Sequence, residues 1–253
     1  MILFLTSSPI GTYRSDETPD YSGFNPANGM VEELQRHWPD QAGCLLISAF
    51  PDEYSLNDRM RQDFEEILRD TGLPFSRMDL CDSRNGQEMA DAVGSYDFII
   101  LGGGHVPTEN AFFRRIGLAD RLAGYDGIVM GISAGSMNCA RTVYAQPEMP
   151  GEAADPAYQR FIPGLGLTDY NVLPHYNAVK SDVIDGLRLM EDITYPDSVG
   201  RTFYAIVDGS YLFQTQSGGE VHAEIRGEAY RIRDGEFGQV CGYGETLDRK
   251  SVV

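Results

Sequence analysis

The stretch YDFIILGGGH at residues 96–105 decides the fold class. A short apolar run leads directly into three glycines. A continuous apolar run of this length is typical of a strand that is buried on both faces. A second run of the same kind, GIVMG at residues 127–131, also ends in glycine. Strands that are covered on both faces belong to parallel sheets between helices, so the two runs predict an α/β fold.

The first half of the chain repeats this alternation of strands and helices. Met60, Phe64, Ile67 and Leu68 recur at helical spacing and predict a helix over residues 57–71. Further strands are expected at residues 1–5, 44–49 and 74–80, and further helices around Met30 and Leu34 and up to about residue 93. Together these elements predict a mostly parallel central sheet with helices on both faces.

The chain changes character after residue 141. Residues 141–170 are rich in proline and glycine and are expected to form a surface excursion. In the last third, apolar and polar residues alternate between glycine turns, which is typical of antiparallel hairpins. Residues 216–253 are therefore expected to form a β-rich tail. No internal repeat or low-complexity linker interrupts the sequence, so residues 1–253 are predicted to form a single domain.

The composition excludes several classes of partner. Acidic residues outnumber basic ones by 38 to 20, and the net charge of −18 repels nucleic acid and anionic membrane surfaces. The four cysteines are far apart and are expected to be buried free thiols: Cys44, Cys81, Cys139 and Cys241. The N-terminal apolar run is shorter than the core of a signal peptide. A cytoplasmic location is therefore expected.

The run at residues 127–131 continues into the pattern Gly131-Ile132-Ser133-Ala134-Gly135, which has the spacing G-x-S-x-G. In a nucleophile elbow, the serine lies on a strained turn between a strand and a helix. The backbone N–H of the next residue then lies at a helix N-terminus, where it can stabilise an oxyanion. The bare glycines at residues 102–104 could supply a second donor. The alternative is a tight turn that merely needs small residues, and Ser136 is a competing serine.

A serine nucleophile needs a base, and the chain has four histidines. His175 follows the apolar run YNVLP and is the best candidate, because it is expected at a strand end. His105 lies on the glycine loop and is a candidate for substrate binding. His37, beside a tryptophan, and His222, in an alternating strand, are expected to have structural roles.

The acid that would orient the base is less well defined. Asp208 follows the strand-like run YAIV and precedes glycine, so it is also expected at a strand end. Asp155, Asp169 and Asp182 are the alternatives. The chain order Ser133, His175, Asp208 differs from the order serine, acid, histidine of the α/β-hydrolase fold. An esterase of that fold would require Ser133, Asp208 and His222, and it remains an alternative.

Four motifs, FIILGGGH, GISAGS, GLGLTDYNVLPHY and YAIVDGSYL, resemble in order and spacing those of the peptidase E/cyanophycinase family of serine hydrolases. The resemblance covers roughly residues 43–215. It implies a class I glutamine amidotransferase-like fold, a flavodoxin-like three-layer sandwich, here with a β-hairpin-rich C-terminal part. By this likeness Ser133 matches the nucleophile and His175 the base. Asp208 matches the acid, a role for which Asp155 is also considered.

The resemblance further implies an oxyanion hole formed by Gly103, Gly104 and Ala134. The expected activity is that of a serine-type peptidase that cleaves a peptide or amide bond in a small peptide. The family includes dipeptidases that prefer an N-terminal aspartate, but the stretch after the histidine offers only Lys180 and Arg188 as cations. That preference is therefore not predicted, and the substrate stays open.

The sequence predicts neither a metal nor an organic cofactor. It contains no clustered histidine and cysteine ligands and no phosphate-binding loop with a lysine. A small peptide or an amino-acid derivative is the expected substrate, and neither nucleic acid nor membrane is an expected partner. A homodimer is left open. A non-catalytic member of the fold that binds a metabolite is the alternative from a different functional class.

Overall fold

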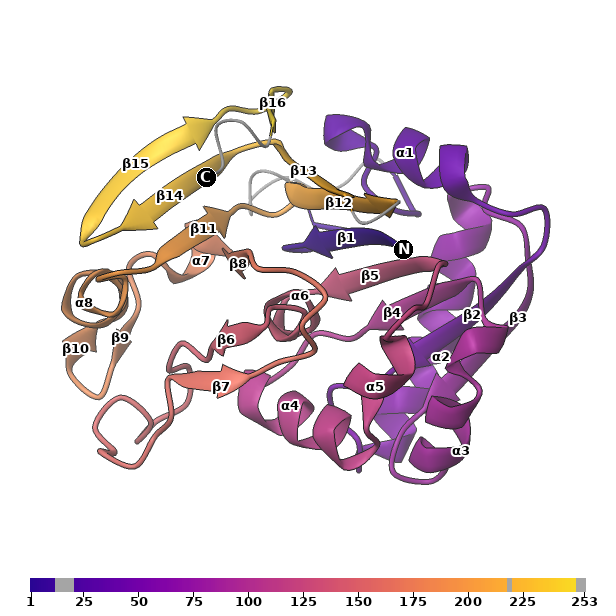
Figure 1. Ribbon diagram of the computed structural model, residues 1–253, viewed down its shortest axis with the longest axis horizontal. Helices are drawn as coiled ribbons and strands as arrows, with labels where there is room; N and C mark the ends of the chain where they lie inside the picture. Colours follow the sequence, from indigo (N-terminus) through magenta and orange to yellow (C-terminus); the bar gives the residue numbers. More distant parts are fainter. Residues whose placement is uncertain (12–20, 218–219, 249–253) are drawn as a thin grey trace.

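The computed structural model describes residues 1–11, 21–217 and 220–248. Within this part of the chain, the largest sheet has eight strands in the order β16-β13-β12-β1-β5-β4-β2-β3 (Figure 1). The five strands from β1 to β3 in this order run parallel, and β12, β13 and β16 continue the sheet in antiparallel pairing. The bounds are β1 (Ile2–Thr6), β2 (Ala42–Ile47), β3 (Phe75–Cys81), β4 (Phe98–Leu101), β5 (Ile128–Ile132), β12 (Tyr211–Ser217), β13 (Glu220–Arg226) and β16 (Thr246–Asp248).

Helices cover both faces of the parallel part of this sheet. Along β1, Leu3 and Leu5 pack into one apolar cluster and Phe4 into another, because successive side chains of a strand point to opposite faces. Helices α1 and α2 contribute to the cluster of Phe4, and α3, α4 and α5 contribute to the other cluster. The bounds are α1 (Met30–His37), α2 (Tyr54–Asp70), α3 (Gly86–Asp91), α4 (Val106–Arg115) and α5 (Leu118–Leu122), with short 3-10 turns at Ala27–Gly29 and Val93–Ser95. The predicted three-layer α/β fold with a mostly parallel sheet is confirmed.

A second sheet has the order β15-β14-β11-β8 in the described residues. Here β8 and β11 run parallel, and the other pairs are antiparallel, as expected for the hairpin-rich C-terminal part. Its apolar face packs with α6 into a third cluster, which includes Ala134, Leu173 and Ala205. The bounds are α6 (Ala134–Asn138), β8 (Asn171–Leu173), α7 (Tyr176–Val179), the π-helical segment Leu189–Thr194, α8 (Tyr195–Asp197), β11 (Thr202–Ile206), β14 (Ala229–Arg233) and β15 (Glu236–Cys241).

Two further strand pairs are antiparallel and short. Strands β6 (Thr142–Tyr144) and β7 (Phe161–Pro163) form one, and β9 (Val183–Ile184) and β10 (Leu187–Arg188) form the other. The segment 141–170 was expected to be a surface excursion, and the structure differs in part. Val143, Tyr144 and Ala145 are buried, because β6 packs into the third apolar cluster. Residues 218–219 and 249–253 of the predicted β-rich tail lie outside the described residues.

The predicted chemistry of the cysteines is confirmed. Cys44, Cys81, Cys139 and Cys241 are all buried and free. Burial raises the pKa of the Cys44 and Cys81 thiols to about 12, so both are neutral and unreactive at physiological pH. In the part of the chain that the structure describes, no helix combines the length and the apolar character that crossing a membrane requires.

Candidate active site

Five strand ends bring the candidate catalytic residues together. In the large sheet, Ser7 follows β1, Ser133 follows β5 and Gly102 follows β4, and these three strands are neighbours. In the second sheet, His175 lies two residues after β8, and Asp208 lies two residues after β11. Because β8 and β11 pair in parallel, their carboxyl ends lie side by side. The predicted residues thus come from the carboxyl ends of two sheets, where α/β proteins bind their ligands.

Ser133 adopts a strained backbone conformation between β5 and α6. Its φ is 50° and its ψ is −114°, outside the favoured regions for a residue with a side chain. Such a conformation costs on the order of 1–3 kcal/mol and persists only where the surroundings enforce it. The Ser133 N–H donates to the Thr6 carbonyl at 3.1 Å, and its own carbonyl accepts from the N–H of Met137 at 3.1 Å. The turn is therefore fixed on one side by β1 and on the other by α6.

The two glycines of the G-x-S-x-G pattern are required by close packing around this turn. A Cβ atom on Gly135 would lie 2.3 Å from the Leu101 carbonyl oxygen, and one on Gly131 would lie 2.7 Å from the Ser136 backbone N. Ser136 is completely buried, and its hydroxyl donates to the Thr6 carbonyl at 2.8 Å. The structure thus gives Ser136 a packing role and leaves Ser133 facing the pocket described below.

His175 is held by a polar network that reaches back to β1. The His175 Nδ1–H donates to Asp208 Oδ1 at 2.7 Å. The Ser7 hydroxyl donates to the same Asp208 oxygen at 2.6 Å and accepts the backbone N–H of His175 at 2.7 Å. His175 itself has a left-handed backbone conformation with φ 57°. Sequence reasoning missed Ser7, although it directly follows the first apolar run.

The charge of Asp208 fits this arrangement. Burial acts to raise its pKa, but the hydrogen bond and the charge of His175, together with the hydrogen bond from Ser7, outweigh burial and lower the pKa below its ordinary value. Asp208 is therefore ionised at neutral pH. An ionised acceptor at Nδ1 keeps the proton of neutral His175 on that nitrogen and leaves Nε2 free to act as a base.

The residues predicted for the oxyanion hole lie beside Ser133. A Cβ atom on Gly103 would be 3.2 Å from the Ser133 Cβ, which shows how closely the glycine loop approaches the serine. The Gly135 N–H donates to the Gly102 carbonyl at 3.1 Å and joins α6 to this loop. Among the described hydrogen bonds, none uses the backbone N–H of Gly103, Gly104 or Ala134. These donors are available for a ligand.

A pocket of about 100 Å³ contains both Ser133 and His175. Its lining is apolar apart from a few polar groups, which include the carboxylates Glu148 and Asp182. The lining residues are Gly104, Val106, Ser133, Ala134, Met137, Gln146, Pro147, Glu148, Pro174, His175, Val179, Asp182, Ile184 and Leu189. None of these residues is a lysine or an arginine. No hydrogen bond joins the side chains of Ser133 and His175 among the contacts of the described residues.

His105 lies at the edge of this pocket. Its ring contacts Thr108 Oγ1 at 2.8 Å and Glu152 Oε1 at 2.7 Å, and it does not belong to the lining. Glu148 accepts the backbone N–H of Val106 at 3.2 Å. Partial burial raises the pKa of the Glu148 carboxyl above its ordinary value, and the Val106 N–H and the nearby histidines offset this only in part.

Most of the alternative acids and bases have other partners in the described part of the chain and do not contact Ser133, His175 or Asp208 there. Asp155 accepts the backbone N–H of Ala157 at 2.8 Å, and Asp169 pairs with Arg141 at 2.9 Å. His37 contacts Glu33 at 3.0 Å. His222 lies on β13, where its nearest ionic contacts are Glu224 at 4.0 Å and Asp248 at 3.9 Å. Of the predicted acids, Asp208 is in contact with His175, and Asp182 lines the pocket.

In the described part of the chain, no group of three or more histidine, cysteine, aspartate or glutamate side chains could hold a metal ion. The polar groups around Ser133 are hydrogen-bond donors, one imidazole and carboxylates. This set can perform acyl transfer, in which a hydroxyl attacks a carbonyl, but it contains no cationic side chain to bind a phosphate.

These features define an α/β protein with a serine at the carboxyl edge of a parallel sheet. Residues 52–220 match the model of peptidase family S51, which covers more than half of the chain. The chain therefore belongs to peptidase family S51, and it is a serine-type peptidase of the peptidase E type. The predicted resemblance is confirmed. No curated protein sequence matches the chain.

Two solved structures share the fold. One is a crystal structure of a peptidase from an acI-B1 Actinobacterium, with a TM-score of 0.62, 18% identity, and coverage of 98% of this chain and 96% of the other. The second is a 1.5 Å crystal structure of a putative peptidase E protein from Listeria monocytogenes EGD-e, with a TM-score of 0.56 and 19% identity. It covers 88% of this chain and 96% of the other. At these identities the likeness concerns the fold.

Proposed function

We propose that this protein hydrolyses a peptide bond in short peptides, with dipeptides as the smallest substrates. Ser133 is the nucleophile, His175 is the general base and acid, and Asp208 orients His175. One observation carries the proposal: Ser133 in its strained turn and His175 with its Nδ1 on Asp208 line the same pocket. Membership of a serine peptidase family supports it.

The chemistry follows from these positions. His175 Nε2 takes the Ser133 hydroxyl proton while the oxygen attacks the scissile carbonyl carbon. The negative charge that develops on the carbonyl oxygen is stabilised by the N–H groups of Ala134 and Gly103. His175 then donates its proton to the leaving amine, and an acyl-enzyme forms. In the second half of the reaction, His175 removes a proton from water while the water oxygen attacks the ester carbonyl; His175 then donates this proton to the Ser133 oxygen as the ester C–O bond breaks and the carboxylic acid product leaves.

The pocket limits the substrate. A volume of about 100 Å³ admits only a small group beside Ser133. Glu148 and Asp182 give the lining a negative charge, which attracts the free α-ammonium group of a short peptide and repels an acidic side chain. We therefore expect peptides with neutral or basic N-terminal residues to be better substrates than peptides that begin with aspartate.

The test is hydrolysis of a dipeptide and amino-acid amide library by the wild type and by Ser133→Ala, His175→Ala and Asp208→Ala. We expect each variant to lower kcat/KM by at least about 10³-fold. A fluorophosphonate probe should label the wild type at Ser133 and should not label Ser133→Ala. Ser136→Ala is the matched control, because Ser136 is a buried serine of α6, the helix that directly follows Ser133, and the variant should retain activity and labelling.

Two outcomes would contradict the proposal. Hydrolysis that survives Ser133→Ala would assign the chemistry to another residue. Activity that is lost with His222→Ala but retained with His175→Ala would favour the chain order of an α/β-hydrolase esterase.

A further inference from the structure

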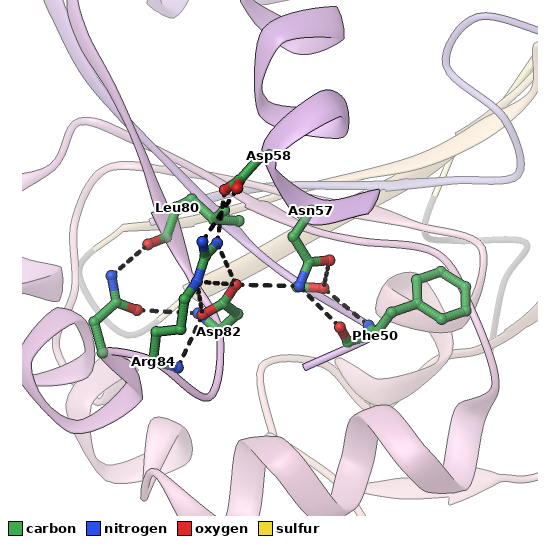
Figure 2. Close-up of polar contacts among 8 residues, drawn as sticks. Phe50, Asn57, Asp58, Leu80, Asp82 and Arg84 are labelled. Atoms are coloured by element: carbon green, nitrogen blue, oxygen red, sulfur yellow. Dashed lines mark hydrogen bonds and ion pairs between the residues drawn. The ribbon is translucent and has the colours of Figure 1, made fainter. Parts of the chain in front are cut away.

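A buried polar network lies behind the Ala49–Phe50 segment, which packs against Gly104, and none of its residues lines the pocket. It joins Asn57 on α2 to Ser48, which follows β2, and to Asp82, which follows β3. Asn57 Nδ2 donates to the Phe50 carbonyl at 2.9 Å and to Asp82 Oδ2 at 3.2 Å (Figure 2). Asn57 Oδ1 accepts the Ser48 hydroxyl at 2.6 Å, and Ser48 Oγ accepts the Phe50 N–H at 2.9 Å. The Asn57 side chain therefore fixes both backbone polar groups of Phe50, one directly and one through Ser48.

Asp82 orients the amide of Asn57. The Asp82 side chain is completely buried and accepts from the Arg84 Nη2 at 2.7 Å, Nε at 3.0 Å and backbone N at 2.9 Å. Burial acts to raise the pKa of Asp82, but the hydrogen bonds from Arg84 and Asn57 lower it below its ordinary value, so Asp82 is ionised. Because a carboxylate only accepts hydrogen bonds, it holds the NH₂ group of Asn57 towards itself and leaves the amide oxygen for Ser48.

The segment that this network holds supports the glycine loop. The Gly102 N–H donates to the Ile47 carbonyl at 3.0 Å. A Cβ atom on Gly104 would lie 2.8 Å from the Ala49 Cβ and 3.0 Å from the Phe50 Cζ. On its other side, the loop approaches the Ser133 Cβ through Gly103. The glycine loop is thus packed between the Ala49–Phe50 segment and the nucleophile, and a shift of Phe50 would move it.

We infer that Asn57, oriented by Asp82, is a positioning residue that sets the distance between the glycine-loop N–H donors and Ser133 by holding Phe50 against Gly104. The inference rests on the proposed function, because it concerns the same oxyanion site. Asn57 and Asp82 touch neither Ser133 nor the pocket and act only through Phe50. An oxyanion donor is effective only at about 2.7–3.1 Å from the developing charge, so a small displacement costs rate and not substrate binding.

The experiment compares Asn57→Ala and Ser48→Ala with two controls, using the best dipeptide from the library. Rates are expressed per active site titrated with the fluorophosphonate probe, so that unfolded protein does not count. We expect each variant to lower kcat by about 10- to 100-fold with KM changed less than about twofold. Affinity for a peptide boronate, which mimics the tetrahedral intermediate, should fall in parallel with kcat. Ser48→Thr, which keeps the hydroxyl, should restore kcat.

The controls separate positioning from stability. Tyr125→Phe removes a buried hydrogen bond, 3.1 Å from the Tyr125 hydroxyl to the Tyr96 carbonyl, at the amino ends of the strands. Asp58→Asn removes the charge of Asp58, the exposed carboxylate that pairs with Arg84, and leaves the hydrogen bond between Asn57 and Asp82 in place. Both should lower the melting temperature without changing kcat.

An unchanged kcat per titrated site in both Asn57→Ala and Ser48→Ala would overturn the inference. It would also be overturned if Tyr125→Phe lowered kcat as much as these two variants do. If Asn57→Ala does not fold, Ser48→Ala and Ser48→Thr decide the question. Failure of the proposed function is recognised separately, because Ser133→Ala would then retain hydrolysis.

Discussion

Ser7 carries the clearest prediction at the scale of single residues. It is completely buried, and it joins the Asp208 carboxylate to the backbone of His175. Ser7→Ala removes the hydroxyl and leaves two partly buried polar groups, the Asp208 carboxylate and the His175 N–H, without this partner, which costs about 1 kcal/mol. We expect kcat/KM to fall about 10-fold, which corresponds to about 1.4 kcal/mol, and the free energy of unfolding to fall by a similar number of kcal/mol. Steady-state kinetics and chemical denaturation measure the two effects.

The pH dependence of this variant has a defined sign. Asp208 has a lowered pKa in the folded state, so its interactions stabilise the fold above its ordinary pKa of 3.8, and this stability is lost as the pH falls through the lower folded value. The difference in stability between wild type and Ser7→Ala should therefore be largest near neutral pH and shrink in acid. A difference that grows as the pH falls would show that Ser7 does not act through ionised Asp208.

The sequence indicated the main site residues because each follows an apolar run. Ser133, His175 and Asp208 were predicted at strand ends, and all three lie there. Ser7 also follows such a run, but the polar stretch after β1 contains several serines and threonines, and nothing local separates them. Its role depends on the pairing of β1 with β12, which brings Ser7 to the segment that carries Asp208, and this pairing is a tertiary property.

At the scale of elements, the contact between α4 and α6 contains a buried titratable group. Glu109 on α4 is completely buried; its Oε2 accepts the Asn138 Nδ2 at 2.9 Å, and its Oε1 has no partner among the described residues. Burial raises the pKa of Glu109 well above its ordinary value of 4.5. The folded state therefore keeps this proton at pH values where the unfolded state has lost it.

The consequence is a loss of stability as the pH rises. Above pH 4.5 the unfolded state binds fewer protons than the folded state at Glu109, so the free energy of unfolding falls by about 1.4 kcal/mol per pH unit until the pH exceeds the raised pKa. Glu109→Gln keeps the acceptor for Asn138 and removes the titration. We expect the melting temperature of the variant, relative to wild type, to increase with pH. Parallel pH profiles for the two proteins would refute this.

Element prediction succeeded where the pattern is local. The strands with continuous apolar runs and the helix with regular apolar spacing, α2, lie close to their expected positions. The second sheet could be predicted only in part from the sequence. Its strand β8 has three residues and pairs with β11, and α7, β9, β10 and α8 lie between these two strands in the chain. A three-residue strand carries too little periodicity to specify a partner, so its pairing follows from the packing of the whole domain.

At the scale of the whole molecule, the net charge and the charge of the pocket have the same sign. The chain carries a net charge of −18, and the described lining of the pocket contains two carboxylates and neither lysine nor arginine. Under the proposed function, we therefore expect the overall field and the local field both to disfavour a substrate with an acidic N-terminal residue. Salt screens the long-range part of this field more strongly than the part inside the pocket.

The resulting prediction concerns substrate charge. For dipeptides that share their C-terminal residue, we expect kcat/KM to be at least about 10-fold higher with an N-terminal asparagine than with an N-terminal aspartate of the same size, which corresponds to about 1.4 kcal/mol. Glu148→Gln and Asp182→Asn should each reduce this ratio. Asp70→Asn changes the net charge by the same amount as these two variants, but Asp70 lies at the end of α2 and outside the pocket lining, so this variant should leave the ratio unchanged.

Because the pKa of Glu148 is raised, the ratio should increase as the pH rises and this carboxyl ionises. If Asp70→Asn lowers the kcat/KM ratio as much as Glu148→Gln does, the preference comes from the net charge of the protein and not from the pocket. If the wild type prefers substrates with an N-terminal aspartate, the pocket carboxylates do not determine the specificity.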